Sequence, residues 1–291
     1  MAPRVWFITG ASSGFGLLMA QKALANGDNV VATLRKPEVI SDLAAQYGKD
    51  RLVVLKLDVK IVGEITAAFE AAKEAFGRID VVFNNAGYGI IAEVEGTSYE
   101  KARDMFEVNF WGAFHVATQA VAFMRDVNKP QGGLLMNMSS MFGIDAPPGA
   151  GFYAATKFAF EAIADSLTRE LDPEWNIKTV TFCPGWFKTN MTLVNAVVEP
   201  IHPAYDRPGN ESLGSIQTRT AGVALIRGDS PLLQDATKLI NKFWDISNLE
   251  TPPTRLAFGE DSKAVFQAKW TTLKADLEAS QEWSKDLGYT D

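Results

Sequence analysis

The stretch VWFITGASSGFG, residues 5–16, joins an apolar run of β-forming residues to a turn made of small residues. The apolar run predicts a buried strand, and the pattern after the turn predicts a helix. Glycines allow a tight turn and a close backbone approach, and the N-terminus of a helix attracts negative charge. The turn therefore indicates a site for the pyrophosphate of a nucleotide, lined by Gly10, Ser12, Ser13, Phe15 and Gly16. A tight turn without a ligand, whose serines only cap the helix, is the alternative.

Short apolar runs alternate with longer helical patterns through the first two thirds of the chain. This alternation is typical of an α/β fold with a doubly wound parallel sheet. The pattern predicts strands at residues 5–9, 29–34, 52–58, 81–84, 133–139 and 177–183. It predicts helices near residues 14–26, 38–47, 62–76, 98–126 and 152–171. Further helices are expected from about residues 215 and 232, and a last strand at 255–258.

Composition and charge narrow the class of protein. The chain has 291 residues, is 47% hydrophobic and carries a formal net charge of −7, with no run of basic residues. Such a chain can fill a sizeable core, and its charge argues against nucleic acid or an anionic membrane surface as a partner. No repeat, low-complexity tract or separating linker is evident, so we expect a single domain over residues 1–291.

Cysteine use and the first residues bear on the compartment. The single cysteine, Cys183, lies in an apolar run, which favours a packed strand residue over a reactive thiol. A lone cysteine fits a reducing compartment. The first strand begins too soon after Met1 for a signal peptide, and no run reaches the roughly 18 apolar residues of a membrane span. We therefore expect a cytoplasmic protein that does not enter a membrane.

The end of the second predicted strand bears on the choice of cofactor. It carries Arg35 and Lys36, and no carboxylate occupies the position that would bind a ribose 2′-hydroxyl. A guanidinium binds a 2′-phosphate through a planar fork, with a lysine as a less directional helper. These residues predict a preference for NADP over NAD, and a pair of solvated surface cations is the alternative.

Polar and small residues follow the third and fourth predicted strands. Asp58, with Val59, ends the third strand and is placed to accept a hydrogen bond from the adenine amine, or to act only as a cap or turn residue. Asn85, Ala86 and Gly87 follow the fourth strand at the carboxyl edge of the sheet, where ligands of such folds bind. We expect all five residues to line the nucleoside site, and a turn without a ligand is the alternative for the last three.

Tyr153 and Lys157 are four residues apart, and Ser140 precedes the tyrosine by thirteen positions. Spacing of four places both side chains on one helix face. A phenol titrates near 10, so a phenol that exchanges protons near neutral pH needs a cation to stabilise its anion. The pair therefore indicates acid–base chemistry, and an ordinary pair on an amphipathic helix is the alternative.

Taken in order, these motifs resemble those of the short-chain dehydrogenase/reductase family. The resemblance is to its NADP-preferring branch, which includes hydroxysteroid and retinol dehydrogenases and fungal ketoreductases. It runs from about Val5 to Thr189 and includes Asn109 in a predicted helix. It implies a Rossmann-like, doubly wound sheet of about seven parallel strands with helices on both faces. It also implies a homodimer or homotetramer and chemistry without a metal ion.

The resemblance also implies roles for the catalytic residues. Tyr153 is similar to the family's general acid, which protonates a carbonyl oxygen as hydride arrives from the nicotinamide. Lys157 resembles the residue that lowers the pKa of that tyrosine and binds the nicotinamide ribose. Ser140 resembles the serine that holds the substrate oxygen, and Asn109 the residue that anchors a water in the proton path. For Asn109 a helix-bending polar residue bonded to backbone is the alternative.

A turn after the sixth predicted strand completes the expected cofactor site. Pro184, Gly185, Phe187 and Thr189 resemble the turn that binds the nicotinamide carboxamide. The segment 188–217 resembles the family's substrate lid, and residues 218–291 form a C-terminal helical extension. Apolar residues in and before the lid favour a bulky, apolar substrate; they are Trp186, Phe187, Met191, Leu193 and Val194.

The function that these features favour is an NADP(H)-dependent oxidoreductase that interconverts a ketone or aldehyde and an alcohol on a small molecule. Two alternatives remain: an NADP(H)-binding sensor or scaffold without turnover, and an isomerase or cyclase of the same fold. His115 and His202 are too widely spaced in the chain to suggest a metal pair.

Overall fold

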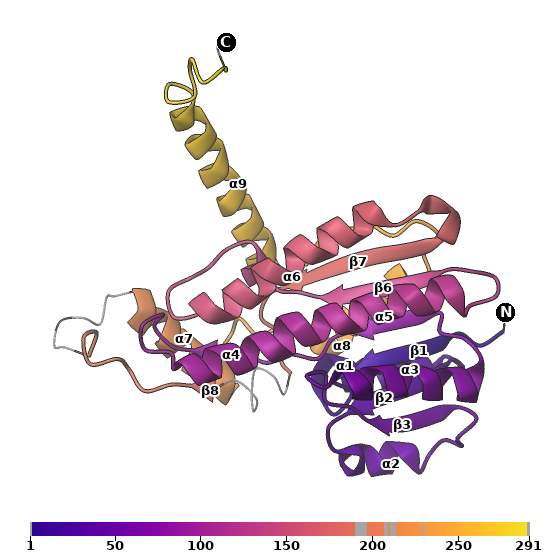
Figure 1. Ribbon diagram of the computed structural model, residues 1–291. Helices are drawn as coiled ribbons and strands as arrows, with labels where there is room; N and C mark the ends of the chain where they lie inside the picture. The colour runs from indigo at the N-terminus through magenta and orange to yellow at the C-terminus, as the bar shows by residue number, and fades with distance from the viewer. Residues whose placement is uncertain (1, 190–196, 207–208, 210–213, 229, 290–291) are drawn as a thin grey trace.

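The computed structural model describes residues 2–189, 197–206, 209, 214–228 and 230–289, and Figure 1 shows their arrangement. Seven strands form one sheet in the order β3-β2-β1-β4-β6-β7-β9. Every neighbouring pair in this sheet is parallel. The strands are β1 (Val5–Thr9), β2 (Asn29–Leu34), β3 (Leu52–Lys56), β4 (Val81–Asn84), β6 (Gly133–Met138), β7 (Ile177–Pro184) and β9 (Arg255–Phe258).

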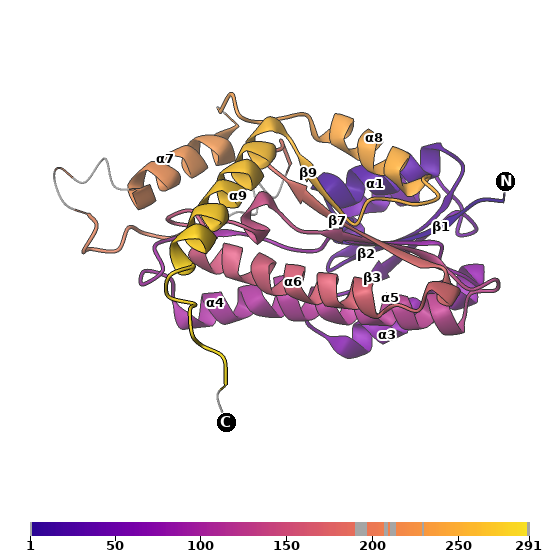
Figure 2. The same ribbon diagram turned by 90° about the horizontal axis from the view of Figure 1, so that it is seen from above.

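Helices cover both faces of this sheet (Figure 2). One face carries α1 (Gly14–Ala25) and α8 (Ala236–Ser247), and the other carries α3 (Val62–Phe76), α5 (Ala113–Asp126) and α6 (Gly151–Glu170). Because side chains alternate along a strand, β1 serves two cores. Its Trp6 and Ile8 pack toward α1 and α8, whereas Val5 and Phe7 pack toward α3 and α5.

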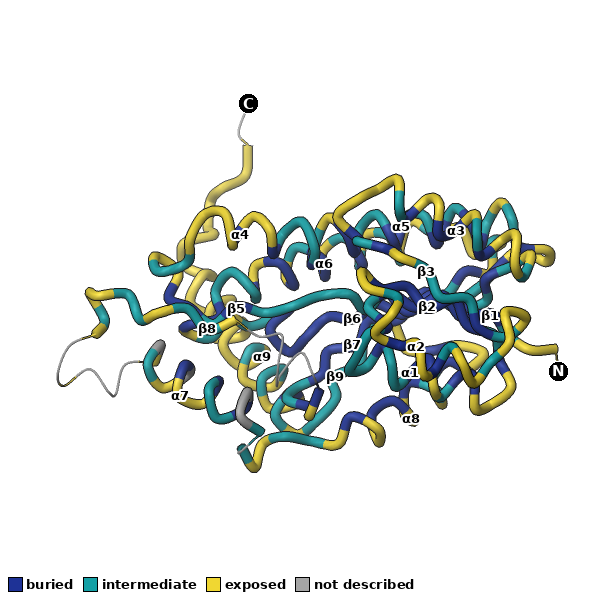
Figure 3. The backbone as a smooth tube through the Cα atoms, turned by 90° about the horizontal axis from the view of Figure 1, so that it is seen from below, coloured by how far each residue is buried: buried dark blue, intermediate teal, exposed yellow. Residues whose placement is uncertain are grey.

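Burial on both faces explains why the strands are almost continuously apolar. Every residue of β1 and of β4 is buried, and Figure 3 shows the buried strands in the middle of the molecule. The predicted doubly wound α/β sheet is therefore confirmed, including the last strand at 255–258.

Several predicted boundaries differ from the structure. The third strand ends at Lys56, two residues early, because Asp58 turns to accept a hydrogen bond from the amide of Lys60. The helix expected at 38–47 is a 3₁₀ turn, Pro37–Ile40, followed by the short α2, Ser41–Ala44. The helix expected from about residue 232 begins at Ala236, where Asp235 caps it.

The helix expected at 98–126 consists of three parts. The segment α4 (Tyr99–Phe106) and the helix α5 are joined by a π-helical turn, Glu107–Gly112. A π turn of this kind inserts an extra residue and is frequent at functional sites. The short strands β5 (Ile90–Ile91) and β8 (Val197–Val198), which pair in parallel, were not predicted.

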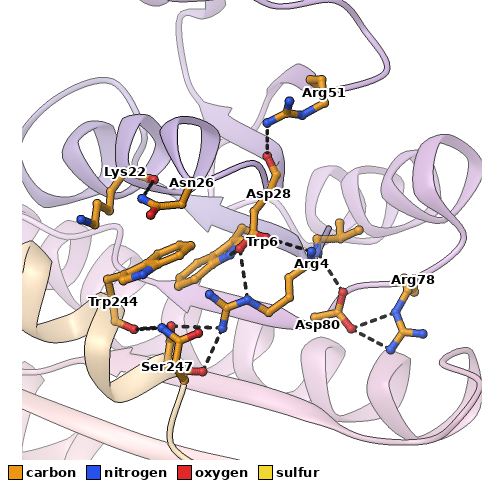
Figure 4. A network of polar contacts seen from close by, with 12 residues as sticks. Arg4, Trp6, Lys22, Asn26, Asp28, Arg51, Arg78, Asp80, Trp244 and Ser247 are labelled. Carbon is orange, nitrogen blue, oxygen red and sulfur yellow. Dashed lines mark hydrogen bonds and ion pairs between the residues drawn. The ribbon is translucent and has the colours of Figure 1, made fainter. Parts of the chain in front are cut away.

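A polar and aromatic network ties α8 to the start of β1 (Figure 4). The ring of Trp6 stacks on that of Trp244, with centroids 5.4 Å apart. The Arg4 guanidinium lies 4.7 Å from the centroid of Trp244 and donates to the carbonyl oxygen of Ser247 at 2.9 Å. Asp28 accepts from both Arg4 and the indole of Trp6. The network fixes α8 in position, although more than 200 residues separate it from β1.

The helices α7 (Gly214–Arg227) and α9 (Glu260–Ser280) belong to the C-terminal part of the chain. In Figure 1, α9 leaves the body of the molecule at its first turns and points away from the sheet. Among the described residues, no helix is both long enough and apolar enough to cross a membrane.

Candidate active site

A cleft of about 720 Å³ lies at the carboxyl ends of the sheet strands. Ligands of open parallel sheets bind at this edge. The cleft brings together most of the predicted site residues; those that line it are Gly10, Ser12, Ser13, Phe15, Arg35, Asp58, Val59, Asn85, Ala86, Gly87, Ser140, Tyr153, Lys157, Pro184, Gly185, Phe187 and Thr189. Three predicted residues do not line it: Gly16, Lys36 and Asn109.

The glycine turn after β1 forms one end of the cleft. Gly10 has a φ of +67°, in the left-handed region that favours glycine. Gly16 lies behind the turn, and a Cβ there would come 2.3 Å from the carbonyl oxygen of Gly10. Gly16 therefore serves close packing of α1 on the turn and has no position in the cleft wall. Ser13 is the N-cap residue of α1, yet its side chain makes no capping hydrogen bond, so the hydroxyl remains available in the cleft.

The loop after β4 is held against the glycine turn by Thr9. The Thr9 hydroxyl accepts hydrogen bonds from the amides of Asn85 and Ala86, at 2.9 and 3.0 Å. The side-chain amide of Asn85 donates in return to the carbonyl oxygen of Thr9 at 2.9 Å. Thr9 was not predicted as a site residue, because its partners are more than 70 positions away in sequence. It fixes the width of the cleft between two adjacent strand ends.

Arg35 lies at the end of β2 with an exposed side chain in the cleft. Within the described residues it has no hydrogen-bond or ion-pair partner, unlike the nearby Lys60, which pairs with Asp104 at 2.8 Å. Asp104 also accepts from the phenol of Tyr88 at 2.8 Å. The pKa of Asp104 is lowered by these hydrogen bonds, from Lys60 first and then from Tyr88. Among the described residues, the guanidinium of Arg35 therefore makes no ion pair and is available to an anion, while its charge helps to lower the pKa of Asp104.

Tyr153 and Lys157 lie on α6 and face the cleft with Ser140, which follows β6. The ammonium of Lys157 is 5.9 Å from the centroid of the Tyr153 ring and donates to the carbonyl oxygen of Met138 at 3.0 Å. The hydroxyl of Ser140 hydrogen-bonds the Tyr153 phenol. The predicted three side chains therefore share one wall of the cleft.

Burial opposes charge on both members of the helix pair. It raises the pKa of the Tyr153 phenol, and the hydrogen bond with Ser140 acts in the opposite direction. Burial lowers the pKa of Lys157 to about 8, while the carboxylate of Glu161 and the thiol of Cys183 act to raise it. An ammonium with a pKa near neutrality is well placed to respond to charge changes on a neighbouring phenol.

Asn109 is fully buried in the π-helical turn. Its amide accepts from the amide of Tyr88 at 3.0 Å and donates to the carbonyl oxygen of Tyr88 at 2.8 Å. It also lies 3.2 Å from the hydroxyl of Thr156 on α6. The two contacts with Tyr88 are hydrogen bonds to backbone, as expected for a helix-bending polar residue. Together with the contact to Thr156, they hold the loop after β4 against α6. Gly87 lies close to both Asn109 and Lys157, since a Cβ on Gly87 would lie 3.1 Å from Asn109 Oδ1 and 3.7 Å from Lys157 Nζ.

A buried charge network behind Lys157 was not predicted. Glu161, one helical turn further along α6, binds Arg255 of β9 through two hydrogen bonds of 2.9 and 2.7 Å. The thiol of Cys183 lies 3.2 Å from the other oxygen of Glu161. Cys183 is fully buried in β7, as expected for a packed strand residue. An i,i+4 spacing from Lys157 to Glu161 was the available sequence signal for this network.

The turn after β7 borders the opposite side of the cleft. The amide of Gly185 bonds the carbonyl oxygen of Phe258, and the amide of Trp186 bonds Asp261 at the start of α9. The ring of Phe187 meets that of Phe15 edge to face at 6.0 Å. The glycine turn and this later turn are therefore packed together through two aromatic rings, and Phe15 has a structural role as well as a place in the cleft.

The part of the cleft next to Ser140 and Tyr153 is apolar. Its walls come from β5, β8, α7 and the segments that follow β6 and β7; they are Ile90, Ile91, Met141, Phe142, Ala150, Trp186, Val197 and Leu225. Phe142 lies edge to face with Trp186 at 5.7 Å and with Tyr153 at 6.4 Å. Met191, Leu193 and Val194, which were expected here, lie outside the described residues.

A buried ion pair joins α7 to the loop after β5. Arg219 of α7 donates to Glu93 Oε2 at 3.2 Å, and both side chains are at most 10% exposed. The same carboxylate oxygen accepts from the amide of His202 at 3.3 Å. Burial acts to raise the pKa of Glu93. Hydrogen bonds from backbone amides and the charge of Arg219 outweigh burial and hold this pKa below its ordinary value. The pair fixes α7 over the apolar part of the cleft.

The two histidines have structural surroundings. The ring of His115 stacks on Trp111, and His202 Nδ1 accepts from the amide of Ala204. Within the described part of the chain, no group of three or more His, Cys, Asp or Glu side chains is arranged to hold a metal ion.

A family model described as short chain dehydrogenase matches residues 4–196. The chain belongs to the short-chain dehydrogenase family. An uncharacterised oxidoreductase, C162.03, of Schizosaccharomyces pombe is 32% identical to this dehydrogenase over 98% of the chain and 91% of the relative. The oxidoreductase calM of Penicillium decumbens is 34% identical over 97% of the chain and 92% of the relative. The protein is thus an oxidoreductase of this family.

Solved structures share the fold over nearly the whole dehydrogenase. A short-chain dehydrogenase from Streptomyces avermitilis is 30% identical, covers 99% of both chains and superposes with a TM-score of 0.85. Two more distant structures hold nicotinamide cofactors. One from Burkholderia phymatum holds NAD, at 21% identity, TM-score 0.73 and coverage of 99% and 98%. One from Burkholderia cenocepacia holds NADP, at 22% identity, TM-score 0.71 and coverage of 94% and 97%.

Proposed function

We propose that this dehydrogenase interconverts a ketone or aldehyde and an alcohol on a bulky, apolar small molecule, with NADP(H) as its cofactor. The observation that carries the proposal is the position of Ser140, Tyr153 and Lys157 between two parts of one cleft. One part is polar and glycine-rich, and the other is lined by aliphatic and aromatic side chains. A dinucleotide and an apolar substrate would meet at these three side chains.

The residues of the polar part fit a dinucleotide. The Ser13 hydroxyl is not used by the helix cap, and Arg35 has no partner among the described residues, so each is free to bind a phosphate. A charge-assisted, bidentate contact to a 2′-phosphate is the strongest use of such a guanidinium. The exposed side chain of Lys36 is absent from the cleft lining, which leaves Arg35 as the residue that favours NADP.

In the proposed reaction the bound cofactor supplies or accepts the hydride. Tyr153 gives its phenolic proton to the carbonyl oxygen during reduction and takes it back during oxidation. Ser140 hydrogen-bonds the same oxygen and keeps it next to the phenol. Lys157 stabilises the phenolate that forms, because its ammonium lies on the same face of α6. Asn109 positions this group by joining the Tyr88 backbone to Thr156.

A series of carbonyl compounds of increasing apolar size tests the proposed function. Burying one methylene is worth about 0.8 kcal/mol, so kcat/KM for NADPH-dependent reduction is expected to rise about three- to fourfold with each added methylene until the cleft is full. Steady-state NADPH oxidation with homologous 2-alkanones and aryl ketones measures this. Replacing Leu225, a buried wall residue on α7, with Asn is the control that should flatten the series.

Two results would favour the alternatives. Tight NADPH binding without oxidation across the whole panel would indicate a sensor or scaffold. Conversion of a substrate while NADPH is unconsumed would indicate an isomerase or cyclase. A preference for the smallest or most polar carbonyl compounds would contradict the apolar substrate class.

The pH dependence of reduction is expected to follow Lys157. Because the pKa of Lys157 is about 8, kcat/KM should be constant below that pH and fall above it, as the ammonium that stabilises the phenolate is lost. The carboxylate of Glu161 acts to raise the pKa of Lys157, so in Glu161→Gln the fall of kcat/KM at alkaline pH should begin at lower pH. This fall is the alkaline limb of the pH profile. A pH series of initial rates for wild type and variant measures the shift.

Arg255 supplies the control for this shift. It neutralises Glu161 through two hydrogen bonds, so Arg255→Gln should leave the limb in place or move it to higher pH. If the alkaline limb moved to lower pH by the same amount in both variants, loosening of α6, and not the charge of Glu161, would determine the pH at which activity falls.

An aromatic face supports a proposed dimer of the cytoplasmic enzyme. Phe106, Phe110, Trp111 and Phe114 make successive edge-to-face contacts along α4, the π turn and α5. Trp111 is 46% exposed there, although it is a large apolar side chain. A two-fold axis at this face would cover it with its own copy.

A further inference from the structure

An apolar stripe runs along α9, the helix that points away from the body of the enzyme in Figure 1. It consists of Phe266, Trp270, Leu273 and Leu277, which are spaced by four, three and four residues. Trp270, Leu273 and Leu277 are 66%, 51% and 67% exposed. Spacing of this kind places apolar side chains at the a and d positions of a heptad, as on a helix that packs against another helix.

Among the described residues, the hydrogen bonds and apolar contacts that attach α9 to the rest of the protein lie at its base. Asp261 accepts from the amide of Trp186, the hydroxyl of Ser262 donates to the carbonyl oxygen of Cys183, and Val265 packs against the cluster around Phe142. Every residue from Trp270 to Ser280 is exposed. Isolated helices of this length are marginal in water, so a helix with an apolar stripe gains most of its stability from a packing partner.

The charges around the stripe distinguish between possible partners. Residues 260–291 contain seven carboxylate side chains and four lysines, which argues against an anionic membrane surface. With Phe266 at d and Trp270 at a, the flanking g positions hold Lys269 and Asp276, and Lys274 lies at e. Within the described residues, Lys269 and Asp276 have no ion-pair partner of their own.

A second copy of the same helix satisfies these charges in one orientation only. In a parallel pair, g faces e of the partner, which would bring Lys269 against Lys274. In an antiparallel pair, g faces g, which brings Lys269 against Asp276 twice because of the two-fold symmetry. The same antiparallel register places Phe266 on Leu277 and Trp270 on Leu273.

We propose that α9 pairs in antiparallel fashion with α9 of a second copy of this chain. The four core residues of each helix form four layers across a two-fold axis near residues 271 and 272. Aromatic side chains bury about 150–250 Å² each when fully covered, so the two tryptophans, which are 66% exposed, contribute about 200–330 Å². Phe266 is already half-buried in the monomer, and with the leucines added the contact stays below the roughly 1,200 Å² of the standard stable interface, which makes the charge pairs part of its stability.

Sedimentation velocity of the full-length protein tests the pairing. Trp270→Glu places a charge in the core of the pair and should halve the molecular mass of the assembly at micromolar concentration. Ala275→Glu is the matched control, because Ala275 lies on the opposite face of the same helix and is exposed. It should leave the mass unchanged. NADPH affinity and the circular dichroism spectrum of each variant show whether the fold is retained.

Charge exchange tests the orientation. Lys269→Asp and Asp276→Lys should each weaken self-association about tenfold, because each turns two attractive contacts into repulsive ones. The double variant K269D/D276K should restore the affinity to within about threefold of wild type. Additive weakening in the double variant would overturn the antiparallel pair.

Two further outcomes would overturn the proposal. An unchanged mass for a folded Trp270→Glu variant would show that α9 does not mediate self-association. Binding of wild type to vesicles of 30% phosphatidylserine, abolished by Trp270→Glu with no change in mass, would assign the stripe to a membrane surface instead.

Discussion

Replacing Tyr153 with phenylalanine is expected to lower kcat for carbonyl reduction by about 100- to 10,000-fold, the contribution usual for a positioned general acid. The substitution removes one hydroxyl and leaves the ring, which packs beside Gly89 and edge to face with Phe142. Affinity for NADPH should change little, because the glycine turn and Arg35 are distant from the substituted atom. Single-turnover kinetics and fluorescence titration with NADPH measure the two quantities separately.

Tyr88 offers a matched control for this experiment. Its phenol also lines the cleft but donates a hydrogen bond to Asp104. Burial raises the pKa of Tyr88, and the hydrogen bond to Asp104 raises it as well, by a smaller amount. Tyr88→Phe should retain kcat to within a few-fold. Comparable losses in both variants would mean that Tyr153 acts through packing, and activity near that of wild type in Tyr153→Phe would disprove its role as the acid.

Replacing Arg35 with alanine is expected to raise the KM for NADPH about 100-fold and to leave the KM for NADH nearly unchanged. The physical reason is that a guanidinium bonded to a phosphate loses two charge-assisted hydrogen bonds, whereas the 2′-hydroxyl of NADH makes no such contact. Initial-rate kinetics with both coenzymes at fixed ionic strength provide the measurement, since exposed charge interactions weaken with salt.

Lys36→Ala is the corresponding control for cofactor preference. Lys36 is exposed and adjacent in sequence but absent from the cleft lining. Its removal should change either KM by less than about threefold. Equal use of NADPH and NADH by the wild-type enzyme would contradict the preference for NADP, and would reassign Arg35 to an ordinary surface cation.

Much of the fold followed from the sequence because strands buried on both faces are apolar throughout. The runs at 5–9, 29–34 and 81–84 matched β1, β2 and β4 residue for residue. Boundaries set by tertiary contacts were less predictable. The pairing of Ile90–Ile91 with Val197–Val198 depends on how the segment before α7 lies over the cleft, and two-residue strands carry no periodic signal.

The candidate site was predictable where its residues follow strands or share a helix face. Seventeen of the predicted residues line the cleft, since they lie at or after a strand end, at the start of α1 or on α6. The residues that were missed act across long separations. Thr9 holds the loop at Asn85, and Glu161 binds Arg255, which is 94 positions away. Such contacts depend on strand order, and strand order has no local signature in the chain.

The surroundings of Cys183 have a practical consequence. Burial raises the pKa of this thiol well above its usual range, and the neighbouring Glu161 carboxylate adds to the effect. Only a thiolate reacts readily with maleimides or haloacetamides, so the native enzyme should resist alkylation. Because the chain has no other cysteine, it provides a silent background in which a fluorophore or spin label can be attached at one engineered surface thiol.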